Sequence, residues 1–161
     1  MKRILIDVNV VLDVLLDRRP HAESASAVWS AVEEGRAEGC LSAHAVTTVH
    51  YLNARAVGAR RARQTTEALL SVFDVAAVDA TVLSAALALG WRDFEDAVTA
   101  AAARRAKCDA LVTRNPRDFK GSPIQVLAPP EAAAWLVGGA SLSAEREPHP
   151  RTHSQALRAE S

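Results

Sequence analysis

Acidic and amide side chains stand at three points where the sequence predicts that a strand ends or a helix begins. They are Asp7, Asp93, Asp96, Asn115 and Asp118. Oxygen ligands of this kind are the ones that Mg²⁺ and Mn²⁺ prefer. Carboxylates that share one cleft repel each other, so a divalent cation would stabilise them. A metal held in this way activates a bound water and neutralises charge on phosphoryl oxygens, so these residue types favour hydrolysis of a phosphodiester.

Asp7 stands where the first buried strand is expected to end. Residues 4–6 form an apolar run without polar alternation, which is typical of a parallel strand that is buried on both faces. A carboxylate beside such a strand is costly to bury without a partner, so we interpret Asp7 as a functional residue. We expect Asn9 to cap a short buried helix that continues to Leu16.

Asp93 and Asp96 lie close enough in sequence for both side chains to point to one side of a helix. The same spacing has an alternative interpretation, because an Asp followed by an acid one turn later is a common capping arrangement. Asp96 precedes Ala97 and a run of small residues, which favours a functional role. We expect Glu95 to point away from this face into solvent, and Asp13 to lie behind the site or on the helix surface.

Short apolar runs alternate with helical patterns along the chain. The expected strands are 4–6, 39–41, 75–78, 110–113 and 125–127, and helical patterns occupy most of the intervals between them. This alternation predicts an α/β fold, a three-layer α/β/α sandwich with a central parallel sheet of four or five short strands. The loops after parallel strands meet at one edge of the sheet, so Asp7, Asn115 and Asp118 should converge there.

The composition predicts one folded domain followed by a tail. A chain of 161 residues fits a single domain, which we place at residues 1–138. Residues 139–161 are rich in Ser, Glu, Arg, His and Pro, so we expect a disordered tail. Lys plus Arg and Asp plus Glu both total 19, which gives no net charge. A nucleic acid would therefore be met by a local group of cations, and Arg114, Arg117 and Lys120 adjoin the expected site.

Several other classes of protein receive no support. Cys40 and Cys108 lack CxxC spacing and lie in apolar stretches, as reduced core residues of a cytoplasmic protein do. No signal peptide precedes Asp7, and no apolar run is long enough to span a membrane. There is no GxxxxGK[ST] or GxGxxG motif for a nucleotide cofactor, and no Ser or Cys has a His placed for acyl transfer.

Four segments together resemble the PIN-domain ribonucleases, especially the toxins of bacterial toxin–antitoxin modules. They are LIDVNVVLDVLLDRRPH (5–21), LSAHAVTTVHYL (41–52), DFEDAVTAAAA (93–103) and LVTRNPRDFKGSPIQVLAP (111–129). The resemblance implies the three-layer fold already expected and RNA cleavage with Mg²⁺ or Mn²⁺. The family's first acid matches Asp7, its helix acid matches Asp96, and its last polar group matches Asn115.

The resemblance predicts a metal-dependent endoribonuclease that is the toxin of a toxin–antitoxin pair. Asp7 and Asp96 would hold the metal, and Asp93 and Asp118 would complete or orient its water shell. Thr113 and Asn115 would position water or phosphate. The partners that it implies are an RNA substrate, a cognate antitoxin and a second copy of the chain, for which the helices at 44–73 offer a surface.

The sequence departs from the family pattern at three positions. Val8 stands where Thr or Ser is common, Thr48 stands where a helix Glu is common, and Asn115 stands where Asp is frequent. These departures favour an alternative, a catalytically degraded PIN fold that binds RNA or a protein. A phosphotransferase of the haloacid-dehalogenase type is a third alternative, but it requires a second Asp where this chain has Asn9.

Overall fold

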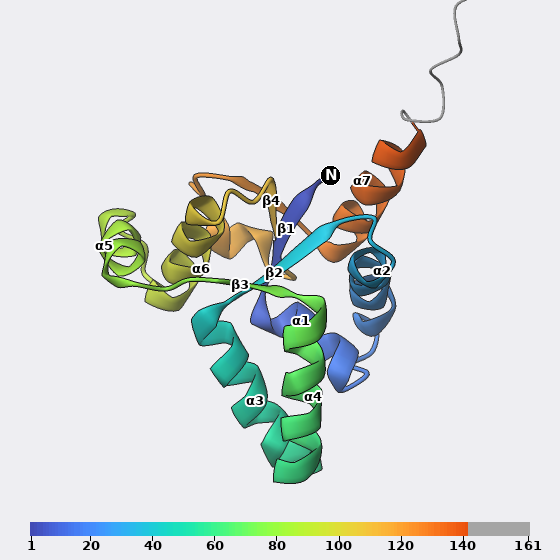
Figure 1. The fold of residues 1–161 in the computed structure, drawn as a ribbon. Coiled ribbons are helices and arrows are strands. Elements are labelled where there is room, and N and C mark those ends of the chain that lie inside the picture. Colours follow the sequence, from blue (N-terminus) through green and yellow to red (C-terminus); the bar gives the residue numbers. More distant parts are fainter. Residues whose placement is uncertain (142–161) are drawn as a thin grey trace, which may run out of the picture.

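The computed structural model describes residues 1–141 of the chain (Figure 1). Within them the strands are β1 (Arg3–Ile6), β2 (Glu38–Ser42), β3 (Asp74–Ala76), β4 (Ala110–Val112) and β5 (Gln125–Leu127). The α-helices are α1 (Val8–Leu15), α2 (Ala22–Glu33), α3 (Ala43–Val57), α4 (Ala59–Val72), α5 (Ala80–Ala88), α6 (Phe94–Arg105) and α7 (Pro129–Ser141), and Pro116–Phe119 forms the 3₁₀ helix η1.

The five strands form one sheet in the order β3-β2-β1-β4-β5, and every neighbouring pair is parallel. The first strand is therefore the central one, and Leu5 pairs with Cys40 on one side and with Leu111 on the other. The predicted α/β fold with a parallel sheet of short strands is confirmed.

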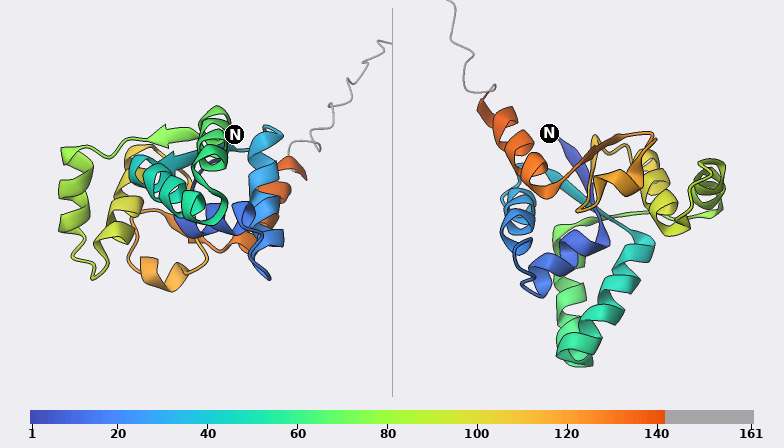
Figure 2. Two further views of the ribbon diagram at one scale, coloured as in Figure 1. Left: turned by 90° about the horizontal axis from the view of Figure 1, so that it is seen from below. Right: turned by 180° about the vertical axis from the view of Figure 1, so that it is seen from behind.

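Alternate residues of β1 face two separate hydrophobic cores. Ile4 and Ile6 pack with Val28 of α2 and Leu136 of α7, whereas Leu5 packs in the second core with Ala100 of α6. Figure 2 shows the corresponding layers, with α1, α2 and α7 on one side of the sheet and α5 and α6 on the other. Because both faces are covered, residues 4–6 of β1 and all of β4 are apolar and buried, as the sequence pattern predicted.

Helices α3 and α4 form an antiparallel hairpin that projects from the sheet (Figure 1). The chain turns at Gly58, whose φ of +90° is one that residues with a side chain rarely adopt. Val49 of α3 and Leu69 of α4 are buried in the first core and attach the base of the hairpin to it. Because α3 follows β2 directly, its first turn lies at the carboxyl end of β2.

One local expectation needs correction, and another lies mostly outside the described residues. The first helix begins at Val8, and its N-cap is Asp7, whose carboxylate accepts a hydrogen bond from the Val8 amide over 2.9 Å; the expected cap at Asn9 was wrong. The last helix continues to Ser141, past the residue 138 at which the folded domain was predicted to end. The remainder of the predicted tail, residues 142–161, lies outside the described residues.

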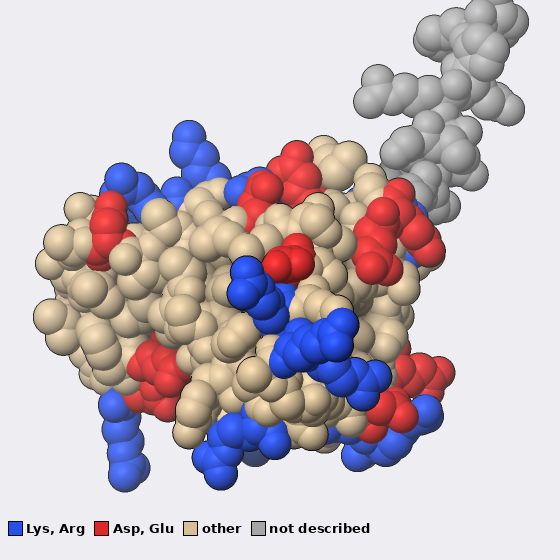
Figure 3. Space-filling view, turned by 60° about the horizontal axis from the view of Figure 1, so that its bottom comes forward, with Lys and Arg blue, Asp and Glu red and all other residues tan. Residues whose placement is uncertain are grey.

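Among the described residues, no helix combines the length and the apolar character that crossing a membrane requires. Basic and acidic side chains alternate over the face shown in Figure 3, in keeping with the zero net charge of the chain.

Candidate active site

The candidate site lies where the carboxyl ends of β1 and β4 adjoin the start of α6. The two strands are neighbours, and the Asp7 amide donates to the Val112 carbonyl over 2.9 Å, so the chain segments that follow them start side by side. Parallel strands bring the loops after them to one edge of a sheet, as expected from the sequence.

Asp7 is held by two hydrogen bonds. One carboxylate oxygen accepts from the hydroxyl of Thr113 over 3.0 Å, and the other accepts from the amide of Val8. Only 8% of the residue is exposed. Burial raises the pKa of Asp7 above its ordinary value, and the hydrogen bonds from Thr113 and Val8 partly oppose that rise. Asp7 is therefore a fixed carboxylate whose charge is poorly solvated.

Thr113 connects Asp7 to the loop that follows β4. Its hydroxyl donates to Asp7 and accepts a hydrogen bond from the backbone amide of Asn115 over 3.2 Å. Thr113 is fully buried, whereas Asn115 is exposed. This arrangement fixes the backbone at Asn115 relative to the first strand and leaves the Asn115 side chain facing solvent.

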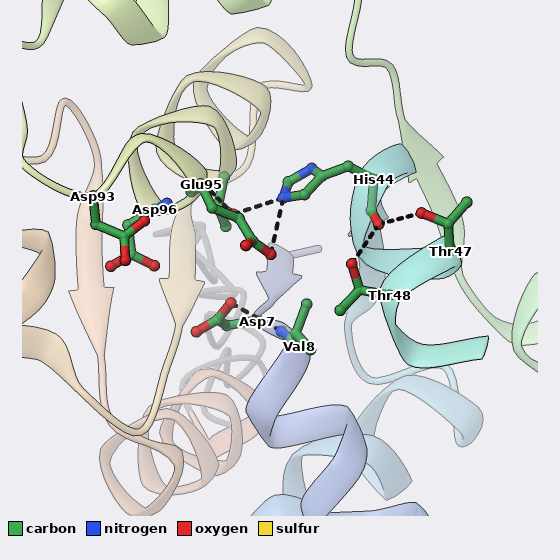
Figure 4. A network of polar contacts seen from close by, with 9 residues as sticks. Asp7, Val8, His44, Thr47, Thr48, Asp93, Glu95 and Asp96 are labelled. Carbon is green, nitrogen blue, oxygen red and sulfur yellow. Dashed lines mark hydrogen bonds and ion pairs between the residues drawn. The ribbon is translucent and has the colours of Figure 1, made fainter. Parts of the chain in front are cut away.

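Asp93 and Asp96 both line a cleft at the start of α6. We call it the α6 cleft; it has a volume of about 610 Å³ and is lined by Trp91, Arg92, Asp93, Phe94, Asp96 and Asp118. Asp93 is also the N-cap of the helix and accepts from the Asp96 amide over 3.1 Å, as the capping interpretation predicted. Figure 4 shows the carboxylates of Asp93 and Asp96 beside each other.

The pKa of Asp96 lies well above its ordinary value. Burial raises its pKa to about 7, and the negative charges of Asp93, Asp7, Asp118 and Glu95 contribute in that order. The structure thus brings the four predicted aspartates close enough for their charges to interact.

Glu95 lies in the site, although we expected it to point away. Its side chain extends from α6 toward Asp7 and His44, and its carboxylate lies 3.9 Å from Nε2 of His44 (Figure 4). Its charge raises the pKa of Asp7 further. No signal in the sequence near Glu95 indicates this contact, because His44 belongs to the first turn of α3.

His44 is a second residue that sequence reasoning missed. Thr99 of α6 lies 3.5 Å from its Nε2 atom, so the ring is placed between α3 and α6. Burial lowers the pKa of His44, and the charges of Glu95 and Asp7 oppose that effect. Thr48, at the position of the missing helix Glu, donates its hydroxyl to the carbonyl of His44 over 3.2 Å.

Asp13 lies behind the site and is completely buried. Its carboxylate forms an ion pair with Arg114, whose Nε is 3.2 Å away, without the alignment of a hydrogen bond. Arg18 lies at 3.9 Å from the other oxygen. Because Arg114 stands between Thr113 and Asn115, the pair joins α1 to the loop of the site. Arg114 is thus engaged by Asp13, and Arg117 and Lys120 are the exposed cations of that loop.

The donor set fits a hard divalent cation held partly through water. Asp7 and Asp96 offer only oxygen ligands, and burial together with neighbouring carboxylates raises the pKa of each, an effect that a divalent cation would oppose. Within residues 1–141, no three His, Cys, Asp or Glu side chains are close enough to enclose a metal by themselves. Mg²⁺ suits such a site because it usually keeps several waters.

Comparison with known proteins agrees with this geometry. The sequence matches the family model of the PIN domain over residues 3–117. No significant match is found among curated proteins.

Three solved structures illustrate the likeness in fold. A toxin–antitoxin complex from Klebsiella pneumoniae is 25% identical, with a TM-score of 0.60 over 78% of this chain and 97% of the other. DNA-bound VapBC from Salmonella typhimurium is 16% identical, with a TM-score of 0.61 over 80% and 99%. The sarcin–ricin loop cleaving toxin VapC20 from Mycobacterium tuberculosis is 20% identical, with a TM-score of 0.55 over 67% and 86%.

Proposed function

Because the chain belongs to the PIN domain family, we propose that it is a metal-dependent endoribonuclease that hydrolyses RNA phosphodiester bonds. The main support is the convergence of Asp7 and Asp96 at the carboxyl edge of a parallel sheet, beside an open cleft that two further aspartates line. So many carboxylates in one place favour a divalent cation over an unassisted reaction.

Asp7 and Asp96 would hold Mg²⁺ or Mn²⁺. A metal bound there supplies a water of lowered pKa and neutralises charge on the phosphoryl oxygens. Thr113 and the Val8 amide fix the orientation of Asp7 through their hydrogen bonds. Asp93 and Asp118 line the same cleft and would orient water in it.

The loop after β4 has a positioning role in this proposal. Thr113 holds the Asn115 backbone through its hydroxyl, and the exposed Asn115 side chain is available to contact water or phosphate. Arg117 and Lys120 extend from the same loop into solvent, where they can attract the RNA backbone.

The decisive test compares cleavage of a panel of RNAs by the wild type and by Asp7→Asn, with and without Mg²⁺. Asn is as good an N-cap as Asp, so the variant keeps the cap of α1 while losing the charge. Asp79→Asn is a control, because Asp79 is also a helix N-cap, accepting from the Val82 amide at the start of α5, and it lies outside the site. We expect cleavage only in Mg²⁺, its loss in Asp7→Asn and its retention in the control. Equal cleavage by both variants, or none with any metal, would refute the proposal.

We further propose that the protein is the toxin of a toxin–antitoxin pair, acts in the cytoplasm and forms a homodimer. The toxin assignment is supported by the likeness to the toxin–antitoxin complex from Klebsiella pneumoniae, whereas the location and the dimer follow from the resemblance to the family. Expression of the wild type should arrest bacterial growth, expression of Asp7→Asn should not, and co-expression of the adjacent gene product should restore growth. Light scattering of the purified chain tests the dimer. Growth that is unaffected by the wild type would contradict the toxin assignment.

A second candidate is a PIN fold that binds RNA or a protein without cutting it. It is favoured by Thr48 in the position of the usual acid, and by the lack of a compact three-ligand group within the described residues. RNA binding that is equally tight with Mg²⁺ and with a chelator, without cleavage, would support this candidate over the nuclease.

A further inference from the structure

Phe94 is an exposed aromatic side chain at the mouth of the α6 cleft. The chain has three Phe residues, and Phe73 and Phe119 are buried in the two cores. Phe94 is 45% exposed although it begins a well-formed helix. Other large apolar side chains are exposed elsewhere, among them Tyr51 and Leu87, but Phe94 lines a cleft in which a ligand can cover its ring.

Besides Phe94 and its three aspartates, the cleft has a second aromatic side chain and one cation. Trp91 lines it and is half-buried, with its ring held edge-on against Phe119 of η1 at a centroid separation of 5.8 Å. Arg92 lines it too and is exposed. The volume of about 610 Å³ lies within the usual range for sites that bind small organic groups. The rings of Trp91 and Phe94 and the guanidinium of Arg92 therefore line the same cleft.

The position of Phe94 in the chain ties this space to the proposed reaction. Phe94 lies between Asp93 and Asp96, and all three line the same cleft. A nucleotide whose phosphate lay at the carboxylates would therefore have its neighbouring base within reach of the ring. Stacking on an aromatic side chain requires a base that is not paired, and it tolerates any of the four bases.

We propose that the α6 cleft binds an unpaired nucleobase of the RNA, stacked on Phe94, with Arg92 beside the adjoining phosphate. This inference rests on the proposed function and names the form of RNA that the site accepts, a strand with an unpaired base next to the bond that is cut. Phe94 would thus favour single strands and loops over duplexes.

The test measures binding of short unstructured RNA by fluorescence anisotropy in Ca²⁺, so that cleavage does not interfere. Each RNA is compared with a series in which one base at a time is absent. We expect the wild type to bind at least one abasic RNA about fivefold or more weakly, which is the lower range for loss of one stacked base. Phe94→Leu should weaken binding of the intact RNA similarly and should remove the abasic penalty. Phe94→Trp should restore both.

Tyr51→Leu is the matched control, because Tyr51 is an exposed aromatic on α3 that does not line the cleft. Its RNA affinity should stay that of the wild type. The inference is overturned if Phe94→Leu behaves like Tyr51→Leu, if no abasic position weakens binding, or if duplex RNA binds as tightly as the single strand. It is equally overturned if Phe94→Leu weakens capture of the antitoxin while RNA affinity stays unchanged. Cleavage that persists in any of these cases would leave the nuclease proposal standing, whereas a wild type that neither binds nor cuts RNA would refute both.

Discussion

The hydroxyl of Thr113 donates a hydrogen bond of 3.0 Å to Asp7, and this contact joins the ends of β1 and β4. Because both residues are buried, Asp7 depends on Thr113 for part of the solvation that water would otherwise give. The Asn115 amide depends on the same hydroxyl. One side chain therefore supports both the proposed metal ligand and the loop next to it.

Thr113→Val should destabilise the protein by about 1–3 kcal/mol, because it leaves a buried carboxylate oxygen and a backbone N–H without a partner while keeping the shape of the side chain. It should also raise the pKa of Asp7 further, since the Thr113 hydrogen bond opposes the effect of burial. Urea unfolding at neutral pH measures the first effect. Thr113→Ser keeps the hydroxyl and serves as the control; a Val variant as stable as the Ser variant would show that the hydrogen bond contributes little.

Glu95→Gln should lower the pKa of His44 beyond its present value. Burial lowers this pKa, and the charge of Glu95 is the larger of the two opposing influences, so neutralising that charge leaves burial less opposed. The His44 ring resonances, followed by NMR across a pH titration, measure the change. Glu67→Gln removes a similar charge from the exposed side of α4 and should leave the His44 titration as it is. A His44 pKa that rises or stays constant in Glu95→Gln would contradict the contact.

Features encoded over a few residues were predictable from the sequence. The apolar run before Asp7 indicated a buried parallel strand with an acid at its end, and the structure has both. The cap at Asp93 was also expected, because an Asp before a helical pattern bonds the amides of its own first turn. The convergence of Asp7 with the loop after β4 followed from the general geometry of parallel sheets.

Contacts between distant segments were not predictable in this way. We expected Glu95 to face solvent, because the periodicity of a helical sequence shows on which face a residue lies. It does not show which other helix packs against that face. The contact between Glu95 and His44 depends on where α3 begins, and that position is set by the pairing of β2 with β1. The position of Asp13 was ambiguous for the same reason, since its partner Arg114 follows β4 and is far from Asp13 in the sequence.

The stability of the metal-free protein should fall as pH rises, because of Asp96. The pKa of Asp96 is raised to about 7 in the folded protein, whereas the pKa of an Asp in an unfolded chain is about 4. The folded state therefore binds more protons between these values, so the contribution of Asp96 is complete below about pH 4 and is lost as pH rises through about 7.

Asp96→Asn should remove this dependence and stabilise the metal-free protein at pH 8 by on the order of 1 kcal/mol, a value reduced for solvent screening of a partly exposed group. Unfolding in urea with a chelator at pH 5 and pH 8 measures the effect. Asp17→Asn, at an exposed acid, is the control and should leave the difference between the two pH values as in the wild type. Equal stabilities of wild type and Asp96→Asn at pH 8 would mean that folding does not raise the pKa of Asp96.

The ion pair between Asp13 and Arg114 should contribute more to the position of the loop after β4 than to the free energy of unfolding. Arg114→Met leaves the carboxylate of Asp13 fully buried with only Arg18 at 3.9 Å, and removing one partner of a buried pair typically costs about 3–5 kcal/mol. Replacing both partners with apolar residues avoids a buried unpaired charge, so Asp13→Leu combined with Arg114→Met should recover most of the loss. Urea unfolding of the two single variants and the double variant gives the coupling.

The double variant also separates the effect of the ion pair on stability from its effect on the position of the loop after β4. With the charges gone, α1 no longer holds the segment from Thr113 to Asn115 through a directed contact, so RNA cleavage should remain well below the wild type even where stability has returned. Amide hydrogen exchange in residues 113–118 should be faster than in the wild type, because the backbone there opens more often. A double variant that regains both stability and full cleavage would mean that apolar packing at this position places the loop as well as the ion pair does.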